Sequence, residues 1–296
     1  MKRKKGILFF FLPVAILPAI LSHSGCRNAT RGEDRPEPVV TVSVLPQKYF
    51  IESITGGKVQ VNVMIPAGAS PASYEPTSRQ MQQLDASGLY VMNGHLGFEK
   101  AWEGKIRENY PGLEMIRLTD HVDLITGGHH GADPHIWMSP KTVRLFLPAL
   151  YSYLKEVYPE MEEWMEIHYA RLMARVDSVD RLMEDSFRDL ASRKFIIFHP
   201  ALTYLARDYG LQQYAMEEEG KEPSVHGMRN LVELARRENI RVIFIQEEFD
   251  QENARTLAAE IGGKVISLNP LDPDWDDNME KIRNTLVSVL QPQEEK

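Results

Sequence analysis

Histidines gather in one short stretch of this sequence, GHHGADPH at residues 128–135, which holds three of the nine histidines in the chain. Clustered imidazoles in a glycine-rich loop are typical of a metal site. The three are His129, His130 and His135. A lone histidine is more often an ordinary core or surface residue, and this is our interpretation of His95, His121, His168 and His226.

Polar residues also follow three apolar runs in the second half of the chain. His199 comes after FIIF, Gln246 after VIFI and Asn269 after VISL. If these runs are parallel strands, their carboxyl ends meet at one edge of a sheet, where α/β proteins bind ligands. The alternative is ordinary turn chemistry, because His-Pro and Asn-Pro are common where strands end.

The elements that would position these residues alternate between strands and helices, which predicts an α/β fold. The predicted strands are residues 39–45, 59–65, 89–92, 195–198, 242–245 and 265–268. The predicted helices are residues 78–84, 99–108, 228–237 and 253–261. Residues 160–190 lack Gly and Pro and keep an apolar spacing of three or four, which predicts one amphipathic helix about 45 Å long. We therefore expect two α/β lobes, each with a mostly parallel sheet, joined by one long rigid helix.

The first residues have the pattern of an export signal, with a basic start at residues 2–5 and an apolar run at 7–21. The single cysteine, Cys26, follows Ser24-Gly25 and is predicted to be lipidated, so that it anchors the mature chain to an envelope membrane. We divide the chain into a signal peptide (1–25), a lipid-anchored tether (26–37), an N-terminal lobe (38–158), a linking helix (159–191) and a C-terminal lobe (192–292).

Charge and missing motifs exclude several functions. The formal net charge is −8, and loss of residues 1–25 removes four basic side chains and no acidic one, which disfavours nucleic-acid binding. The sequence contains no HExxH, GxSxG, GxxxxGK or GxGxxG pattern. Zincin-type and phosphate-cradling enzymes are therefore not expected.

Six segments of the chain resemble a known family, the zinc- and manganese-binding solute-binding lipoproteins of ABC importers, which include the streptococcal adhesin-type proteins. The segments are PAGASPASYEPT (66–77), NGHLGFE (93–99), DPHIWMSP (133–140), FHPALTYLARDYGL (198–211), EPS (222–224) and NPLDPDWDDNM (269–279). The resemblance implies a metal site in the cleft between two lobes. It also implies a monomer on the outer side of the membrane that hands its metal to a membrane permease.

The resemblance places the histidines of the DPH and HP motifs on His135 and His199, which are the expected metal ligands. The other family positions differ here. By this resemblance, Ala72 stands at the position of the family's first histidine, and Gln246 and Asn269 stand at the positions of its two carboxylates. We keep Gln246 and Asn269 as candidate ligands. Two imidazoles and two amides would leave a divalent cation without charge compensation. Candidate substitutes are Glu75, Glu247, Glu248, His129 and His130.

The expected cargo is Zn²⁺, with Mn²⁺ second, because manganese prefers the carboxylate oxygens that are missing. We expect a binding protein and not an enzyme. One alternative is a family member whose metal site has decayed, leaving an envelope interaction or adhesion protein. The other is a metallohydrolase that uses His135 and His199 with a nearby glutamate as general base.

Overall fold

The computed structural model describes residues 38–127, 131–217, 221–247 and 249–291. They contain two four-stranded sheets, ordered β2-β1-β3-β4 and β6-β5-β7-β8, and the pairings between neighbouring strands are all parallel. The first sheet consists of β1 (Val39–Val42), β2 (Gln60–Val63), β3 (Leu89–Met92) and β4 (Glu114–Arg117). The second consists of β5 (Lys194–Ile197), β6 (Gln212–Ala215), β7 (Val242–Gln246) and β8 (Lys264–Leu268). The expected α/β class is confirmed.

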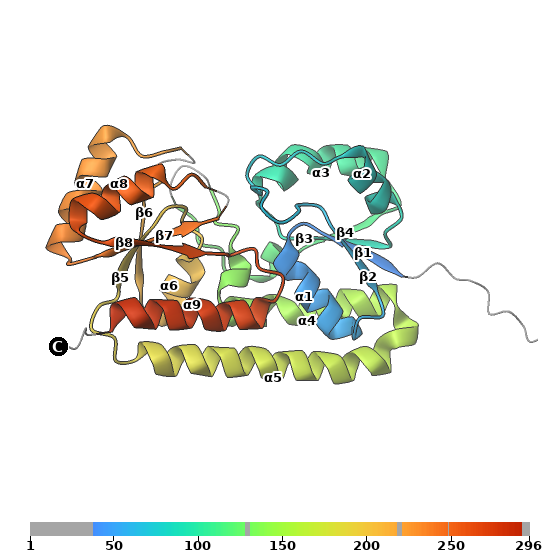
Figure 1. Cartoon of the computed structure of the whole chain (residues 1–296). Coiled ribbons are helices and arrows are strands. Elements are labelled where there is room, and N and C mark those ends of the chain that lie inside the picture. Colours follow the sequence, from blue (N-terminus) through green and yellow to red (C-terminus); the bar gives the residue numbers. More distant parts are fainter. Residues whose placement is uncertain (1–37, 128–130, 218–220, 248, 292–296) are drawn as a thin grey trace, which may run out of the picture. The chain divides into compact units, whose positions relative to one another are not determined.

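Helices cover both faces of each sheet (Figure 1), which explains why β3 is buried along its whole length. Those around the first sheet are α1 (Leu45–Thr55), α2 (Ser78–Asp85), α3 (Gly97–Asn109) and α4 (Pro140–Val157). Those around the second are α6 (Thr203–Tyr209), α7 (Val225–Arg237), α8 (Glu252–Ile261) and α9 (Trp275–Leu290). The described residues also form three short 3₁₀ helices: η1 (Leu118–His121), η2 (Ile136–Met138) and η3 (Pro159–Met161).

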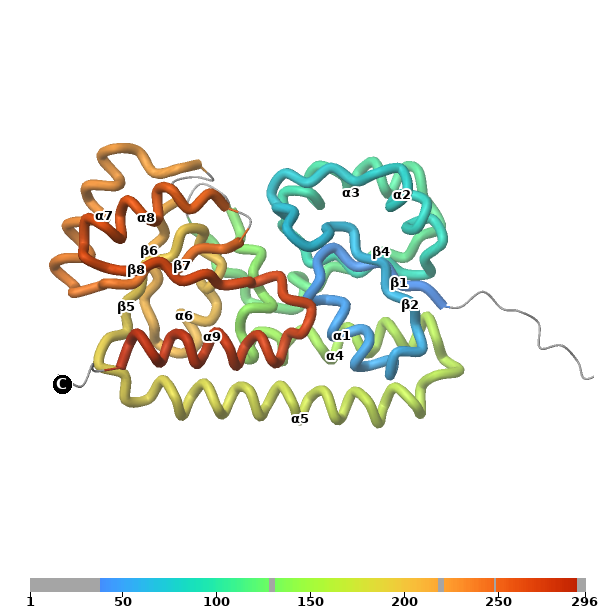
Figure 2. Tube along the Cα trace, viewed as in Figure 1, coloured from blue at the N-terminus to red at the C-terminus, as the bar shows by residue number. Residues whose placement is uncertain are grey.

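The long helix α5 (Glu162–Phe187) connects the two lobes. It contacts α1 and α4 of the first lobe and α6 and α9 of the second. Figure 2 shows α9, near the end of the chain, returning to lie beside α5. Both sheets lie within one compact unit that begins at Glu37, and one hydrophobic core contains residues of both lobes, such as Phe50, Phe146 and Trp275.

The predicted helices and strands differ from the observed ones mainly in where they begin and end. Some helices and strands were not predicted at all. The strand expected over 39–45 ends at Val42, because Leu45-Pro46 already forms the first turn of α1, where proline is favoured. The long helix begins at Glu162, two residues later than expected, because Pro159–Met161 forms η3. The elements missed were α1, α4, α6, α9, β4 and β6. Among the described residues, no helix is both long and apolar enough to cross a membrane.

Candidate metal centre

His199 follows β5 at the carboxyl edge of the second sheet. The preceding residue, Phe198, is held on both sides: its N–H donates to Phe244 O on β7 (2.7 Å), and its carbonyl accepts from Glu217 N, just beyond β6 (3.0 Å). The buried amide of Gln246, at the end of β7, donates to His199 O (2.7 Å) and accepts from His199 N (3.3 Å). Neighbouring strands therefore fix the backbone that carries this imidazole.

His135 lies in the loop that leads into η2 and is held by contacts from both lobes. Asp133 Oδ1 accepts from His135 N (2.8 Å). From the end of β3, Asn93 Nδ2 donates to Pro134 O (2.8 Å). From α6 of the other lobe, the Tyr204 hydroxyl donates to Asp133 O (2.8 Å). Contacts from both lobes therefore fix the DPH segment.

The structure brings His135 and His199 together. Their Nε2 atoms are 3.3 Å apart, and their rings meet at 70° with centroids 5.0 Å apart. Two nitrogens bound at about 2.0–2.1 Å to a tetrahedral zinc ion lie about 3.3 Å apart. The Nε2 pair thus has the spacing of one edge of a zinc coordination tetrahedron. The side chains are 13% and 26% exposed, so the pair is shielded but reachable.

A carboxylate lies behind each imidazole. Asp133 Oδ1 is 2.8 Å from His135 Nδ1, and Glu217 Oε2 is 2.5 Å from His199 Nδ1. Because an ionised carboxylate only accepts, a neutral imidazole at either position carries its proton on Nδ1 and presents a lone pair on Nε2. Burial alone would raise the pKa of Asp133, but the positive charge of His135 when its ring is protonated, together with the hydrogen bonds from His135, outweighs this and leaves the pKa below its usual value. Two lone pairs facing each other favour a cation between them.

The other candidate ligands are already engaged, exposed or outside the described residues. Both amide atoms of Gln246 bind the backbone of His199. Asn269, directly after β8, accepts from Leu271 N through Oδ1 (3.0 Å). Glu75, Ala72 and Glu247 are exposed. The candidates His129, His130 and Glu248, and the predicted lipidation site Cys26, lie outside the described residues.

Within the described part of the chain, no group of three or more His, Cys, Asp or Glu side chains could hold a metal ion. Asp133 and Glu217 do not add ligands, because they meet the rings at Nδ1 and not at the facing Nε2 atoms. The donors that these residues offer a metal are therefore two imidazole nitrogens. Such a set suits zinc, which accepts nitrogen ligands and tolerates positions filled by water.

Sequence reasoning missed three neighbours of the histidine pair. Glu217 was missed together with β6, although it follows the rule that polar residues after neighbouring strands converge. The ring of Phe249 stacks on His199, with centroids 5.4 Å apart and planes at 27°. Asp133 was noted only as part of a motif, and its contact with His135 is local in sequence.

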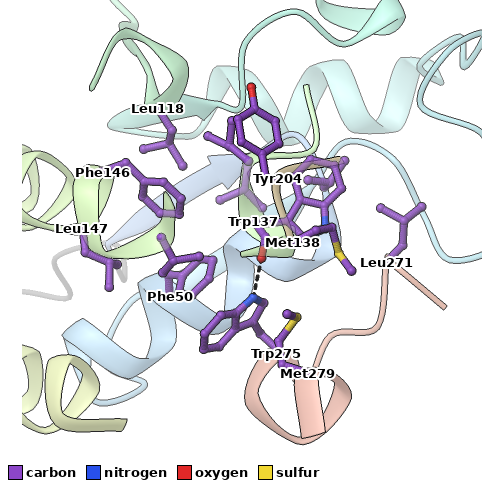
Figure 3. Packing of buried hydrophobic residues seen from close by; sticks show 14 of the residues in the cluster. Phe50, Leu118, Trp137, Met138, Phe146, Leu147, Tyr204, Leu271, Trp275 and Met279 are labelled. Carbon is purple, nitrogen blue, oxygen red and sulfur yellow. Dashed lines mark hydrogen bonds between the residues drawn. The ribbon is translucent and has the colours of Figure 1, made fainter. Parts of the chain in front are cut away.

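Two buried tryptophans, one of them next to His135, connect the two lobes. Trp137, whose ring centroid is 5.4 Å from that of His135, donates from Nε1 to Pro270 O (2.8 Å). Trp275 Nε1 donates in turn to Trp137 O (2.7 Å), as Figure 3 shows. Because both indole rings are buried, η2 is held firmly between the lobes.

Two parallel α/β lobes joined by one long helix define a two-lobed binding protein. The family model for zinc-uptake complex component A, periplasmic (ZnuA), matches residues 40–289. The chain belongs to this family.

Individual relatives agree with this assignment. Zinc-binding lipoprotein AdcA of Streptococcus pneumoniae (strain ATCC BAA-255 / R6) is 26% identical over 285 residues, which cover 90% of this chain and 56% of AdcA. This chain therefore spans little more than half of AdcA. The high-affinity zinc uptake system protein ZnuA of Bacillus subtilis (strain 168) is 25% identical over 292 residues, covering 92% of this chain and 90% of ZnuA. A crystal structure of ZnuA has a TM-score of 0.82 and 32% identity, covering 86% of this chain and 99% of the other.

Proposed function

We propose that this chain captures Zn²⁺ outside the cytoplasm and delivers it to the membrane permease of an ABC importer. The observation that carries the proposal is the pair of Nε2 atoms of His135 and His199, which face each other at 3.3 Å with a carboxylate behind each ring. Zinc is favoured over manganese because both donors are nitrogens. The proposal assigns binding and release, and no catalytic step.

In this proposal His135 and His199 are the protein ligands, and water completes the coordination of zinc. Gln246 positions His199 through the backbone, since its amide is already committed there. Asn269 and Glu75 as further ligands stay predictions. An acidic chain with membership in a zinc-uptake family supports a cation as cargo.

Thermal unfolding of the purified, metal-free protein tests the proposal. Zinc at a hundredfold excess over its dissociation constant should stabilise the fold by about 2.7 kcal/mol, and a His135→Ala/His199→Ala variant should lose this gain. Manganese should stabilise less at equal concentration. If neither metal raises the melting temperature, the decayed-site alternative replaces metal capture.

Delivery to a permease has its own test in cells. A strain that lacks this protein should grow poorly when zinc is limiting. Wild-type protein should restore growth, and the double histidine variant, produced at the same level, should not. Equal rescue by both proteins would contradict a role for the histidine pair in uptake.

The membrane anchor is proposed from the sequence alone. Cys26 follows small residues after an apolar run, and family relatives include a zinc-binding lipoprotein. Acylation of Cys26 would hold the metal-binding lobes near the permease. Wild-type protein should sediment with membranes, whereas Cys26→Ala should move to the soluble fraction. Sedimentation of both forms would contradict the anchor.

A further inference from the structure

The metal site has a charge problem if its ligands are two neutral imidazoles. A divalent cation transferred from water into a largely buried site needs nearby negative charge. The candidate ligands Gln246 and Asn269 are uncharged and cannot supply it. The amide of Gln246 is, in addition, turned toward the backbone of His199.

Two carboxylates nevertheless lie behind the two imidazole rings, on the side away from the proposed metal position. Asp133 and Glu217 are only 16% and 10% exposed in their side chains, and each contacts the Nδ1 atom of one of the two facing imidazoles. Their combined charge of minus two equals in size the charge of one divalent cation. The imidazole ring lies between each carboxylate and the cation, so the carboxylate polarises the ring and makes Nε2 a stronger donor.

Glu217 is the more informative of the two residues. Asp133 also accepts from the backbone N–H of His135, so its loss would disturb the DPH loop itself. The Glu217 backbone is fixed independently of its side chain, because Glu217 N donates to Phe198 O (3.0 Å) at the end of the β5–β6 pair. Changing the Glu217 side chain should therefore leave the strand edge in place.

We propose that Glu217 is a positioning residue which, together with Asp133, supplies through the imidazole rings the negative charge that the uncharged Gln246 and Asn269 do not bring. This inference rests on the proposed capture of zinc by His135 and His199. It places the negative charge of the site on the residues that hold the ligands and not on the ligands themselves. The site therefore remains suited to a divalent cation.

Three variants separate charge from orientation. Glu217→Gln removes the charge while its amide oxygen can still accept from His199 Nδ1–H. Glu217→Ala removes both the charge and the acceptor. Glu233→Gln removes a carboxylate from an exposed position on α7 of the same lobe and serves as the control for overall charge. Zinc affinity is measured by competition with a chelating dye, and ¹⁵N NMR of the metal-free protein reports which ring nitrogen of His199 carries the proton.

Glu217→Gln should lower zinc affinity about 10- to 100-fold, the usual effect of losing a residue behind a ligand, while His199 keeps its Nδ1 proton. Glu217→Ala should lower affinity further and lose the preference for the Nδ1 proton. Glu233→Gln should match wild type in both measurements. These results would establish Glu217 as the source of charge and orientation.

Wild-type affinity in Glu217→Gln and Glu217→Ala would overturn the inference and leave zinc capture standing. If the wild-type protein itself binds no zinc, the proposed function fails. The NMR measurement still separates the two ideas in that case, because an unchanged His199 proton position in Glu217→Ala would overturn the orienting role on its own.

Discussion

The Nε2 atoms of His135 and His199 lie 3.3 Å apart although 64 residues separate them in the sequence. One imidazole comes from a loop held by the end of β3, and the other follows β5 of the second sheet. A cation between them would bind to both lobes at once. Loss of either ring should therefore remove most of the site.

His135→Ala and His199→Ala should each lower zinc affinity by more than the roughly 10- to 100-fold that loss of a residue behind a ligand costs. The double variant should bind little more weakly than either single variant, because one imidazole alone cannot hold the ion. His226→Ala, at an exposed position on α7, is the control and should bind as wild type does. Calorimetric titration with zinc compares these four variants with the wild type. Purely additive, small losses would contradict a shared site.

Gln246→Ala should destabilise the metal-free protein by about 1–3 kcal/mol, because it removes two hydrogen bonds and leaves the N–H and C=O of His199 without their buried partner. Urea unfolding gives the free energy of unfolding. Gln82→Ala, at an exposed position on α2, should change this free energy little. A neutral effect of Gln246→Ala would mean that its amide does not support His199.

Tyr204→Phe should cost about 1 kcal/mol of stability, since the buried hydroxyl donates to Asp133 O and accepts from Ile125 N (3.3 Å). The matched control is Tyr110→Phe, whose hydroxyl makes no hydrogen bond within the described residues. Because Tyr204 holds the DPH loop from the other lobe, zinc affinity should also fall in Tyr204→Phe. Thermal unfolding with and without zinc measures both effects, and equal values for the two variants would rule out this role.

Glu99 gives the protein a specific dependence on pH. The carboxylate is buried and accepts from Ser43 Oγ (2.5 Å) and from the N–H groups of Asn93, Gly94 and Leu96. Burial raises the pKa of Glu99 to about 7, although these hydrogen bonds lower it in part. Between its usual pKa of 4.5 and about 7, the folded protein holds a proton that the unfolded chain has lost. This contribution to stability therefore falls as the pH rises through that window.

The glutamine side chain in Glu99→Gln cannot ionise, so the stability of this variant should lack the pH dependence that Glu99 causes. The free energy of unfolding of wild type, minus that of Glu99→Gln, should fall by up to about 1.4 kcal/mol per pH unit between pH 4.5 and 7. Glu108→Gln, at an exposed position on α3, should show no such trend. Urea unfolding at several pH values measures the difference. A constant difference across the window would show that Glu99 does not titrate there.

Apolar pattern was sufficient to predict the class of fold. The apolar runs that became β3, β5 and β7 have few alternatives, because strands buried on both faces must be apolar throughout. The edge strand β6, sequence QQYA, has half-exposed or exposed residues and lacks this signal. Since β6 was missed, so was Glu217, although the strand-end rule that found His199 also applies to it.

The role of Gln246 shows a second limit of sequence reasoning. Its position at the end of β7 was predicted correctly, but the direction of its amide depends on which buried polar groups need a partner. The N–H and C=O of His199 lie within its reach and take both amide atoms. Likewise, the DPH motif identifies His135, but only the folded chain shows that its Nε2 faces that of His199.

Zinc capture by the two histidines is tested most directly by the position of zinc in a crystal of the zinc-loaded protein, with diffraction recorded on both sides of the zinc absorption edge. We expect one anomalous peak about 2.0–2.1 Å from Nε2 of both His135 and His199. Asp133 and Glu217 should remain on the Nδ1 atoms. A peak that contacts only one of the two imidazoles, or that lies away from both, would contradict zinc capture by this pair.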